Sequence, residues 1–582
     1  MTIEIPEFPS PSIVDSRRLM GPNLYSERMG VVLEVTFDDA AADSVLGAWA
    51  AQASLLAQLL DWGAPEFYIR PEKGAASLFL AAPVDALMAS TEVNEQAWVL
   101  AEADSNGEVP ESLIERLRAA IDAERATKPH LAAAYDAAID RGLNVTFDDE
   151  SFTIGSGGGS QTWTLASIPD VADIDWSALH DVPTVLVTGS NGKTTTTRLV
   201  AAMWRAAGRE TGWSCSDGVW VDDDQLEQGD YSGPAGARVV LRDTRVNAAV
   251  LETARGGILR RGLAVSRADA AIITNVAADH FGEYGMTNLR DLAAAKGVVA
   301  RTLGDRGTLV INADDPMLVE LAASLSTRLA WFSRSAEHPA LDAHVLAGGD
   351  AATLHDGRVM LHHDDVWHDL GDMSAMPLTL NGTATHNIEN VLGAALLASE
   401  AGVPVDCIRE TLARFGASPS DNPGRLQVYR FGEVTVLVDY AHNPDGLAAL
   451  CETAKGMPAK RRLVILGQAG NRGDEQLRAL ARAAWTTIPF DRIIIKEMSA
   501  LLRGRQSGEI SAILADELSR LGVPVDHVET ASSELEAVRR AFAWAQDGDL
   551  LVCPVHVDQK AVLDWLRQLT DARWVAGMPL PS

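Results

Sequence analysis

The spacing of apolar and polar positions changes along the chain and divides it into regions with different predicted elements. In the first part, the runs 30–37 and 67–70 are rich in strand-forming residues, whereas 43–61 and 111–125 have the spacing of amphipathic helices. Strands and helices are mixed here without a regular order. We therefore predict a smaller α+β domain at the N-terminus.

From Thr184 onwards the pattern becomes regular. Short β-rich runs at 184–188, 248–251 and 270–274 are separated by turns and helical stretches, such as the one at 288–303. Strands that alternate with helices build a mainly parallel sheet that is covered on both faces. The middle of the chain is therefore predicted to be an α/β domain with a parallel sheet.

A second alternating pattern begins near Asp421. Its predicted strands and the helical stretches between them lie at 435–438, 462–466, 475–485, 492–495, 533–545 and 549–552. This order is typical of a doubly wound, Rossmann-like α/β domain. We expect such a domain at the C-terminal end.

A glycine- and serine-rich run, Gly155–Ser160, separates the first region from the second. We interpret it as a flexible connector in preference to a phosphate loop, because no apolar strand leads from it into a helix. The Pro- and Asp-containing stretch 168–183 completes the linker. We therefore expect an N-terminal domain at 1–165, a linker at 166–183, a central domain at 184–420 and a C-terminal domain at 421–582.

Composition supports several globular domains and restricts the partners. Hydrophobic residues make up 47% and charged residues 22% of the 582 residues, which is ordinary for globular proteins. The 49 Lys and Arg against 80 Asp and Glu give a formal charge of −31. A field of that sign repels nucleic acid and anionic membranes and favours cationic partners. We expect no nucleic-acid partner.

Cysteine usage and the apolar stretches favour a soluble protein of a reducing compartment. The four cysteines are too far apart for a disulfide framework or a zinc site: Cys215, Cys407, Cys451 and Cys553. Residues 1–6 lack the features of a signal peptide. The apolar stretch 45–60 contains Gln52 and Gln58 and is shorter than the ~20 residues of a membrane span, so we interpret it as a core helix. We expect a cytoplasmic protein without a membrane partner.

The strongest local signal is the sequence TGSNGKTT at 188–195, which follows a predicted strand and opens a predicted helix. Glycines let backbone amides approach phosphate oxygens, and a helix N-terminus adds partial positive charge. Lys193 is suited to the β- and γ-phosphates and the Thr194 hydroxyl to Mg²⁺. Val187 stands where the general phosphate-loop pattern has its first glycine. The predicted nucleotide ligands of this loop are Gly189, Ser190, Asn191, Gly192, Lys193, Thr194 and Thr195.

Glu252 directly follows the apolar run 248–251. A carboxylate in that place lies at the carboxyl end of a parallel strand, where open α/β sheets keep their sites. By itself it could be a surface glutamate. Beside a phosphate loop on a neighbouring strand, it is better interpreted as a metal ligand.

These and further motifs resemble the Mur ligase family, whose members are ATP-dependent enzymes that join amino acids to acyl acceptors. The matching segments are TGSNGKT at 188–194, ETARGG at 252–257, Thr274-Asn275-Val276 leading to Asp279-His280, Lys296, HNIEN at 386–390 and DYAHNP at 439–444. The resemblance extends from about Val182 to the C-terminal end. It implies a P-loop Mur ligase-like central domain, followed by the C-terminal domain of that family.

Within the family, the branch of the cyanophycin synthetases is the most similar. The segments 252–260, 274–280 and 503–505 resemble it, and so does the N-terminal segment 17–26. Members of that branch carry a large ATP-grasp domain between these parts, whereas this chain has only a short strand-like stretch at 151–163. That domain adds the backbone aspartate, so we expect only the Mur-type ligation of an amino acid to a carboxylate.

The resemblance implies that ATP converts a substrate carboxylate to an acyl phosphate, which an amine then attacks to give an amide. Two Mg²⁺ ions would assist. The implied metal ligands are Thr194, Glu252, His280 and Lys296, and the implied catalytic residues are Lys193, Glu252, His280 and Lys296. The family's lysine at the position of Lys296 is carbamylated, which turns a cation into an anionic ligand. A lysine on a solvated helix face is the alternative interpretation.

Further roles follow from the same resemblance. Asn275, Asn387, Asn390, Arg425, Asp439 and His442 are predicted to bind ATP. Asn390 is expected to contact adenine, because an amide donates and accepts together. Arg425 is expected to reach a phosphate across a domain boundary or, alternatively, to cap a turn. Predicted substrate ligands are Arg255, Arg503, Arg505 and Glu509.

The predicted activity is ligation of an amino acid to an Asp- or Glu-containing peptide, with a basic amino acid as in the cyanophycin branch. We expect a homo-oligomer, a dimer. One alternative is a non-catalytic nucleotide-binding scaffold. Retention of Lys193, Glu252 and Lys296 argues against it. Another alternative is a ligase for cell-wall or folate-type acceptors, but those branches carry different N-terminal domains.

Overall fold

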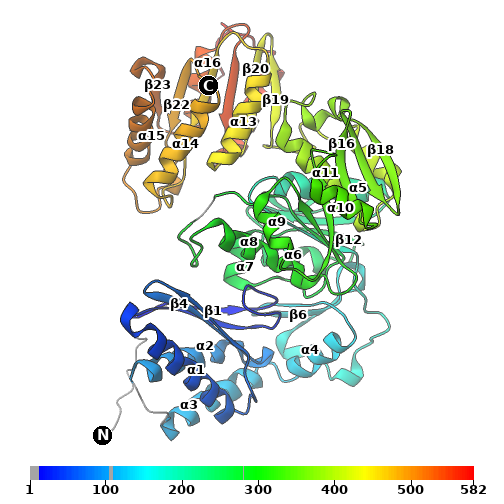
Figure 1. Cartoon of the computed structure of the whole chain (residues 1–582), viewed down its shortest axis with the longest axis vertical. Coiled ribbons are helices and arrows are strands. Elements are labelled where there is room, and N and C mark those ends of the chain that lie inside the picture. The colour runs from blue at the N-terminus through cyan, green and yellow to red at the C-terminus, as the bar shows by residue number, and fades with distance from the viewer. Residues whose placement is uncertain (1–11, 104–108, 279–280, 582) are drawn as a thin grey trace.

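The computed structural model describes residues 12–103, 109–278 and 281–581. Three bodies built from strands and helices follow one another along the long axis of the molecule, with the N-terminal sheet at one end and the C-terminal sheet at the other (Figure 1). Within the described residues, no helix combines the length and the apolar character that a membrane span requires.

The N-terminal body is built on a four-stranded antiparallel sheet of order β1-β2-β4-β3. Apolar residues of β2 and β4 pack with Trp49 and Trp98 of two helices in a core on one face of this sheet. The predicted α+β character is confirmed. The elements are β1 (Ile13–Leu19), β2 (Gly30–Thr36), α1 (Ala42–Leu59), β3 (Phe67–Glu72), β4 (Ala75–Ala81), α2 (Leu87–Glu102), α3 (Glu111–Ala126) and α4 (Leu131–Asp140).

A small antiparallel sheet of β5 (Val145–Phe147), β6 (Ser151–Ile154) and β7 (Gln161–Thr164) links this body to the central one. The run at 155–160 is not the flexible connector that its composition suggests. Gly158 N donates to Val246 O at 2.7 Å, and a Cβ on Gly159 would lie 2.3 Å from His180 O. These glycines therefore allow a tight backbone contact, which composition alone could not distinguish from flexibility.

The central body has an eleven-stranded sheet of order β11-β10-β9-β12-β8-β13-β14-β15-β16-β17-β18. It is parallel from β9 to β16 and antiparallel at both edges. Its strands are β8 (Thr184–Thr188), β9 (Thr211–Cys215), β10 (Gly218–Val221), β11 (Asp224–Gln228), β12 (Ala248–Glu252), β13 (Ala270–Ile273), β14 (Thr308–Asn312), β15 (Arg328–Ser333), β16 (Ala351–His355), β17 (Arg358–His363) and β18 (Val366–Asp372).

Helices cover both faces of this sheet because successive strand residues point to opposite sides. In β8, Leu186 belongs to one apolar core, whereas Val185 and Val187 belong to the other. The helices of this body are α5 (Lys193–Ala206), α6 (Pro234–Arg242), α7 (Arg255–Arg261), α8 (Leu289–Gly297), α9 (Pro316–Ala322), α10 (Pro339–Leu346), α11 (Thr385–Glu400) and α12 (Val405–Leu412).

The C-terminal body has a six-stranded sheet of order β19-β20-β24-β21-β22-β23, parallel except for β19. Apolar cores on its two faces fit the doubly wound, Rossmann-like architecture predicted from the sequence. The elements are β19 (Gln427–Phe431), β20 (Val434–Asp439), α13 (Pro444–Gly456), β21 (Arg462–Leu466), α14 (Asp474–Thr487), β22 (Arg492–Lys496), α15 (Glu509–Arg520), β23 (Val528–Ala531), α16 (Glu534–Trp544), β24 (Leu550–Pro554) and α17 (Gln559–Asp571).

Candidate active site

A tight loop connects the central strand β8 to α5. Gly189 has φ 147° and Gly192 has φ 84°, both outside the range that side chains favour. A Cβ on Gly189 would lie 1.9 Å from Thr274 Oγ1, and one on Gly192 would lie 2.1 Å from Asn390 Oδ1. The two glycines therefore let the backbone turn within a space that a larger residue would fill.

Hydrogen bonds from the segment that follows β13 fix the backbone of this loop. Asn191 N donates to Asn275 Oδ1 at 2.9 Å, and Asn275 Nδ2 donates to Asn191 O at 3.1 Å. Thr274 Oγ1 donates to Asn191 O at 2.6 Å. Asn275, which the sequence marks as a nucleotide ligand, thus braces the loop. Its side-chain amide holds the backbone that would face the phosphates.

The first amides of α5 have no acceptor within their own helix and are available to an anion at its N-terminus. Lys193 Nζ donates to Ser190 O at 3.0 Å, so its ammonium group lies over the same loop. Backbone donors and a cation thereby converge at the carboxyl end of β8. This donor set fits the phosphates of a nucleotide.

Thr194 and Glu252 supply the oxygen atoms that a Mg²⁺ ion would need. Thr194 Oγ1 donates to Glu252 Oε2 at 2.8 Å, and both residues are buried. Burial raises the pKa of Glu252, and the positive charges of Lys193 and Arg425 oppose that rise. Hydroxyl and carboxylate oxygens are ligands that Mg²⁺ prefers, so this pair fits one ion.

The residues predicted for a second ion are only partly described. Lys296 lies in α8 and is 4% exposed, which excludes the alternative of a solvated helix face. Asp279 and His280 lie outside the described residues. The roles of His280 and of a carbamylated Lys296 therefore stay predictions.

Two side chains of the C-terminal part reach the phosphate loop. Arg425 Nη2 donates to Ser216 Oγ at 2.7 Å and lies 3.5 Å from Asp217 Oδ2. Its guanidinium group stacks 4.2 Å from the ring centroid of Tyr440. Asn443 Nδ2 donates to Asn191 Oδ1 at 2.9 Å. Arg425 thus reaches from the segment before β19 into the central site.

Ser216, Asp217 and Tyr440 were not predicted as site residues. Ser216 and Asp217 directly follow β9, the strand next to β12 in the sheet. The carboxyl ends of neighbouring strands meet at one edge, so recognition of β9 would have identified these two side chains. Tyr440 lies in the DYAHNP segment, and its ring packs against the guanidinium group of Arg425.

The other predicted nucleotide ligands have well-defined partners. Asn390 Nδ2 donates to Asn387 Oδ1 at 2.9 Å, and Asn387 Nδ2 donates to Leu378 O at 3.0 Å. Asn387 therefore orients Asn390, whose other amide atom lies next to Gly192. Asp439 Oδ2 accepts from Leu426 N at 2.7 Å and so fixes the backbone beside Arg425. His442 Nδ1 lies 3.1 Å from Tyr440 O.

Among the predicted substrate ligands, Arg505 and Glu509 form an ion pair of 2.6 Å. Arg505 also donates to Gly470 O at 3.0 Å and to Arg472 O at 2.8 Å, and it lies 2.7 Å from Asp474 Oδ1. Arg505 thus shapes the loop before α14. Arg503 is exposed on a left-handed turn with φ 49°. Arg255 is buried and pairs with Glu283 at 2.5 Å.

A buried polar network supports the segment that carries Asn443. Lys496 Nζ contacts Glu534 Oε1 and donates to Pro554 O at 2.6 Å and to His556 Nδ1 at 3.0 Å. His556 Nε2 lies 2.9 Å from Ala441 O. Burial lowers the pKa of His556 well below its usual range, so the neutral ring accepts at Nδ1 and donates at Nε2. Nothing in the sequence motifs pointed to this chain of contacts.

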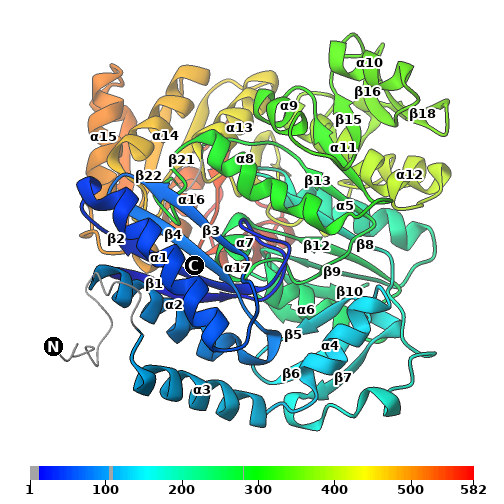
Figure 2. The same cartoon turned by 60° about the horizontal axis from the view of Figure 1, so that its bottom comes forward.

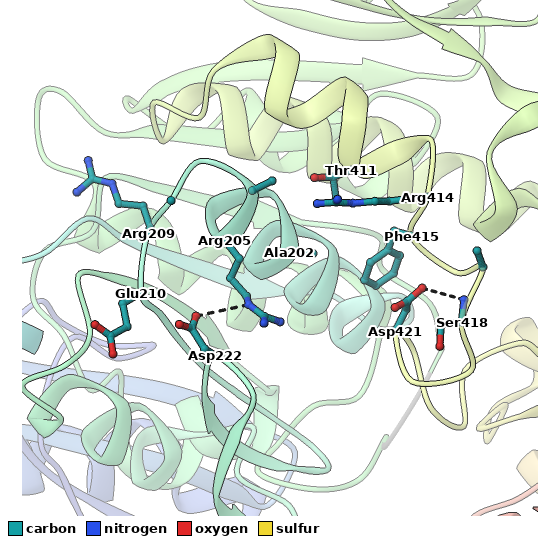
Figure 3. Close-up of a pocket in the computed structure, with 13 residues that line it drawn as sticks. Ala202, Arg205, Arg209, Glu210, Asp222, Thr411, Arg414, Phe415, Ser418 and Asp421 are labelled. Atoms are coloured by element: carbon teal, nitrogen blue, oxygen red, sulfur yellow. Dashed lines mark hydrogen bonds and ion pairs between the residues drawn. The ribbon is translucent and has the colours of Figure 1, made fainter.

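A cavity of about 830 Å³ lies at the opposite end of α5, between that helix and the segment after α12 (Figure 3). Arg205 pairs there with Asp222 at 3.5 Å, and Ser418 N donates to Asp421 Oδ2 at 3.0 Å. The cavity is lined at one side by the start of the segment that leads to Arg425. It shares no lining residue with the phosphate loop and is separate from the candidate active site.

Comparisons with known proteins agree with this geometry. Residues 187–398 match the model of the Mur ligase middle domain, and 424–554 match that of the Mur ligase glutamate ligase domain. A cyanophycin synthetase from Crocosphaera subtropica is 37% identical over 371 residues, which are 64% of this chain and 42% of that protein. The chain thus spans less than half the length of that relative.

More distant relatives cover a similar share of the chain. A UDP-N-acetylmuramoyl-L-alanyl-D-glutamate–2,6-diaminopimelate ligase from Syntrophomonas wolfei is 25% identical over 414 residues, which are 68% of this chain and 77% of that protein. A solved structure of E. coli FolC in complex with DHPP and ADP has a TM-score of 0.48 and 19% identity, and it covers 67% of this chain and 89% of that one.

Proposed function

Because this chain carries the middle and C-terminal domains of the Mur ligases, we propose that it is an ATP-dependent ligase that joins an amino acid to a substrate carboxylate. The observation that carries the proposal is the phosphate loop with the buried Thr194–Glu252 pair at its end. Motif matches indicate the family. The Thr194–Glu252 pair would supply oxygen ligands for the Mg²⁺ ion that phosphoryl transfer requires.

The residues of this chain account for the first step. The loop amides and Lys193 would bind the β- and γ-phosphates of ATP, while Thr194 and Glu252 would hold Mg²⁺. Bound Mg²⁺ neutralises charge that develops on the transferring phosphoryl group. The substrate carboxylate attacks the γ-phosphorus, the bond to the β-phosphate oxygen breaks, and ADP leaves. Arg425 is close enough to the loop to contact the same phosphates after it leaves Ser216.

In the second step an amine attacks the acyl phosphate. The carbon–nitrogen bond forms, inorganic phosphate leaves, and the nitrogen loses a proton to give the amide. Cationic groups around the loop stabilise the departing phosphate. Neutral His556 and buried Lys496 would keep the segment with Asn443 in place while the bond forms.

We further propose an acidic peptide as acceptor and a basic amino acid as donor of the amine. Similarity to the cyanophycin synthetases supports this choice of substrates. The net charge of −31 favours the approach of a cationic amino acid. The loop that Arg505 fixes, with Asp474 and Glu509 beside it, is the candidate location for that amino acid.

The test is a matrix of Asp- or Glu-containing peptides against the common amino acids, with ATP and Mg²⁺, read by mass spectrometry for an amide product. With acceptor carboxylates labelled by ¹⁸O, an acyl phosphate route transfers one labelled oxygen to inorganic phosphate. Lys193→Ala should abolish this transfer, whereas Lys455→Ala, on the exposed face of α13, should retain it. Nucleotide binding without product for any combination would instead support the non-catalytic scaffold.

A further inference from the structure

The N-terminal sheet faces the part of the central body that carries α7 and α8 (Figures 1 and 2). From this sheet, Arg70 in β3 reaches the loop 281–288 and the start of α8. Its Nη2 donates to Gly285 O at 2.8 Å and lies 2.9 Å from Asp291 Oδ1. Its Nη1 lies 3.3 Å from Tyr284 O. One guanidinium group thus joins two successive segments of the central body.

Asp291 connects Arg70 to the N-terminus of α8. It belongs to a capping box in which Asn288 Oδ1 accepts from Asp291 N at 3.0 Å. Asp291 Oδ2 accepts from Thr287 N at 2.9 Å, while its other oxygen faces Arg70. These partners on both oxygen atoms hold the carboxylate in one orientation. Loss of Arg70 would leave one oxygen without this contact. Lys296, the predicted metal ligand, lies in the same helix about one and a half turns further on.

Other side chains of the N-terminal body also pack against the loop 281–288. A Cβ on Gly285, which has φ 68°, would lie 1.7 Å from Glu72 Oε1. The guanidinium carbon of Arg17 lies 4.8 Å from the ring centroid of Tyr284. The neighbouring Glu283 is bound to Arg255 at 2.5 Å and accepts from Asn471 Nδ2 at 3.2 Å. The loop is thus bound to side chains from all three bodies.

We propose that Arg70 is a positioning residue for the ligation reaction, which sets the loop 281–288 and α8 relative to the phosphate loop. This inference rests on the proposed function. It gives the N-terminal body a direct part in the reaction of the central body. Among the residues that the structure describes, Arg70 contacts Tyr284, Gly285 and Asp291 and none of the predicted catalytic side chains. It acts through Gly285 and Asp291. Loss of a group that orients a metal ligand typically costs about 10–100-fold in metal affinity or activity.

The experiment compares Arg70→Met with Arg242→Met in the full chain. Arg242 of the central body contacts the small linking sheet, with Nη1 2.7 Å from Asp148 Oδ2 and Nε 3.0 Å from Thr153 Oγ1, and it does not reach the loop. Methionine keeps the aliphatic stem in both variants. Hydrogen exchange is measured by mass spectrometry without substrates, so this readout does not depend on turnover.

We expect peptides that cover 281–291 to exchange about tenfold faster in Arg70→Met and to remain unchanged in Arg242→Met. In the ligation assay, the Mg²⁺ concentration for half-maximal rate should rise roughly tenfold in Arg70→Met, with an unchanged KM for ATP. Arg70→Lys, which keeps the charge next to Asp291, should restore part of both effects.

Unchanged exchange in Arg70→Met, or an equal increase in Arg242→Met, would overturn the positioning role. If Arg70→Met does not fold, the same comparison is made with Arg70→Lys, for which no change in exchange or Mg²⁺ dependence overturns the inference. A wild-type chain without turnover would refute the proposed ligase and leave the exchange comparison to decide on Arg70.

Discussion

Gly192 has φ 84° at the turn into α5, and a Cβ built there would lie 2.1 Å from Asn390 Oδ1. Alanine at this position would therefore strain the backbone and also displace the amide next to it. Gly208 offers the matched control, because it has φ 77° but nothing within 4 Å of a built Cβ. The difference between the two variants isolates the close contact from the backbone strain.

We predict that Gly208→Ala lowers the free energy of unfolding by about 1 kcal/mol and leaves ADP binding unchanged. Gly192→Ala should in addition weaken ADP binding at least about tenfold, because Asn390 and the loop must move apart. Urea unfolding and titration calorimetry measure the two effects. Equal ADP affinities for the two variants would contradict this account of the loop.

Lys496 and Glu534 form a fully buried ion pair, so each residue depends on the other. Burial lowers the pKa of Lys496, and Glu534 opposes that change. We predict that Lys496→Met lowers the free energy of unfolding by about 3–5 kcal/mol, because Glu534 remains buried without its cation. Chemical unfolding followed by circular dichroism measures this loss.

The double variant Lys496→Met with Glu534→Leu tests the cause. It should recover most of the lost stability, since no uncompensated charge is left in the core. The exposed pair Lys455–Glu452 serves as the control, and Lys455→Met should change stability by less than about 0.5 kcal/mol. A double variant as unstable as the single one would show that the lost hydrogen bonds from Lys496 to Pro554 O and His556 Nδ1, and not the uncompensated charge, explain the effect.

Among the individual elements, those with a clear repeating pattern could be predicted. The predicted strand 184–188 is β8, and the predicted helix 475–485 lies within α14. The stretch 288–303 was predicted as one helix, but α8 ends at Gly297 and a 3₁₀ segment follows it. The strands β14 to β18 were not predicted. β18 is exposed at the edge of the sheet and carries no continuous apolar run.

Helix α11 contains two glutamates whose folded-state protonation differs from that of ordinary surface acids. Burial raises the pKa of Glu389 from 4.5 to about 7, against the opposing charge of Arg334. Burial and the hydrogen bond with Asp350 raise the pKa of Glu400 from 4.5 to about 7. An acid with a raised folded pKa binds its proton more tightly when folded. The stability that it contributes is present below pH 4.5 and is lost as the pH rises towards 7.

We therefore predict that the free energy of unfolding of Glu400→Gln, relative to that of the wild type, rises by about 1–3 kcal/mol between pH 5 and pH 7. Glutamine keeps a hydrogen-bonding group but cannot ionise. Urea unfolding at several pH values measures the slope. Glu410→Gln, on the exposed face of α12, should leave the slope as in the wild type, and an unchanged slope in Glu400→Gln would contradict the prediction.

Local sequence patterns do not predict the contacts between the three bodies. Arg425 and Ser216 are 209 positions apart, and Asn443 and Asn191 are 252 positions apart. Each residue type is ordinary in its own segment, so only the packing of the bodies reveals the pair. Motif residues within one segment could therefore be predicted, whereas the contact of Arg425 with Ser216 and the contacts of Arg70 with the loop 281–288 could not.

Arg425 gives the final prediction, because it connects the C-terminal body to the phosphate loop. Burial opposes its charge, yet Asp217 and Glu252 raise its pKa, so the cation is retained in this site. Asp217 holds it at 3.5 Å and also pairs with Arg198 at 2.7 Å. Phosphates bound at the loop would compete with Asp217 for the same guanidinium group. Arg425 would then bind a phosphate only when the two bodies are close together.

We predict that Arg425→Met lowers the rate of acyl phosphate formation about 100-fold or more while ADP affinity changes by less than about tenfold, because the contact matters most for charge that develops in the transition state. Rapid-quench measurement of ¹⁸O transfer from the acceptor to phosphate gives the rate, and calorimetry gives the affinity. Arg430→Met, on the exposed side of β19, is the matched control in the same body and should leave both values as in the wild type. If Arg425→Met weakened ADP binding as much as it slowed the reaction, Arg425 would be a ground-state nucleotide ligand, and closure of the two bodies would not be needed to explain its effect.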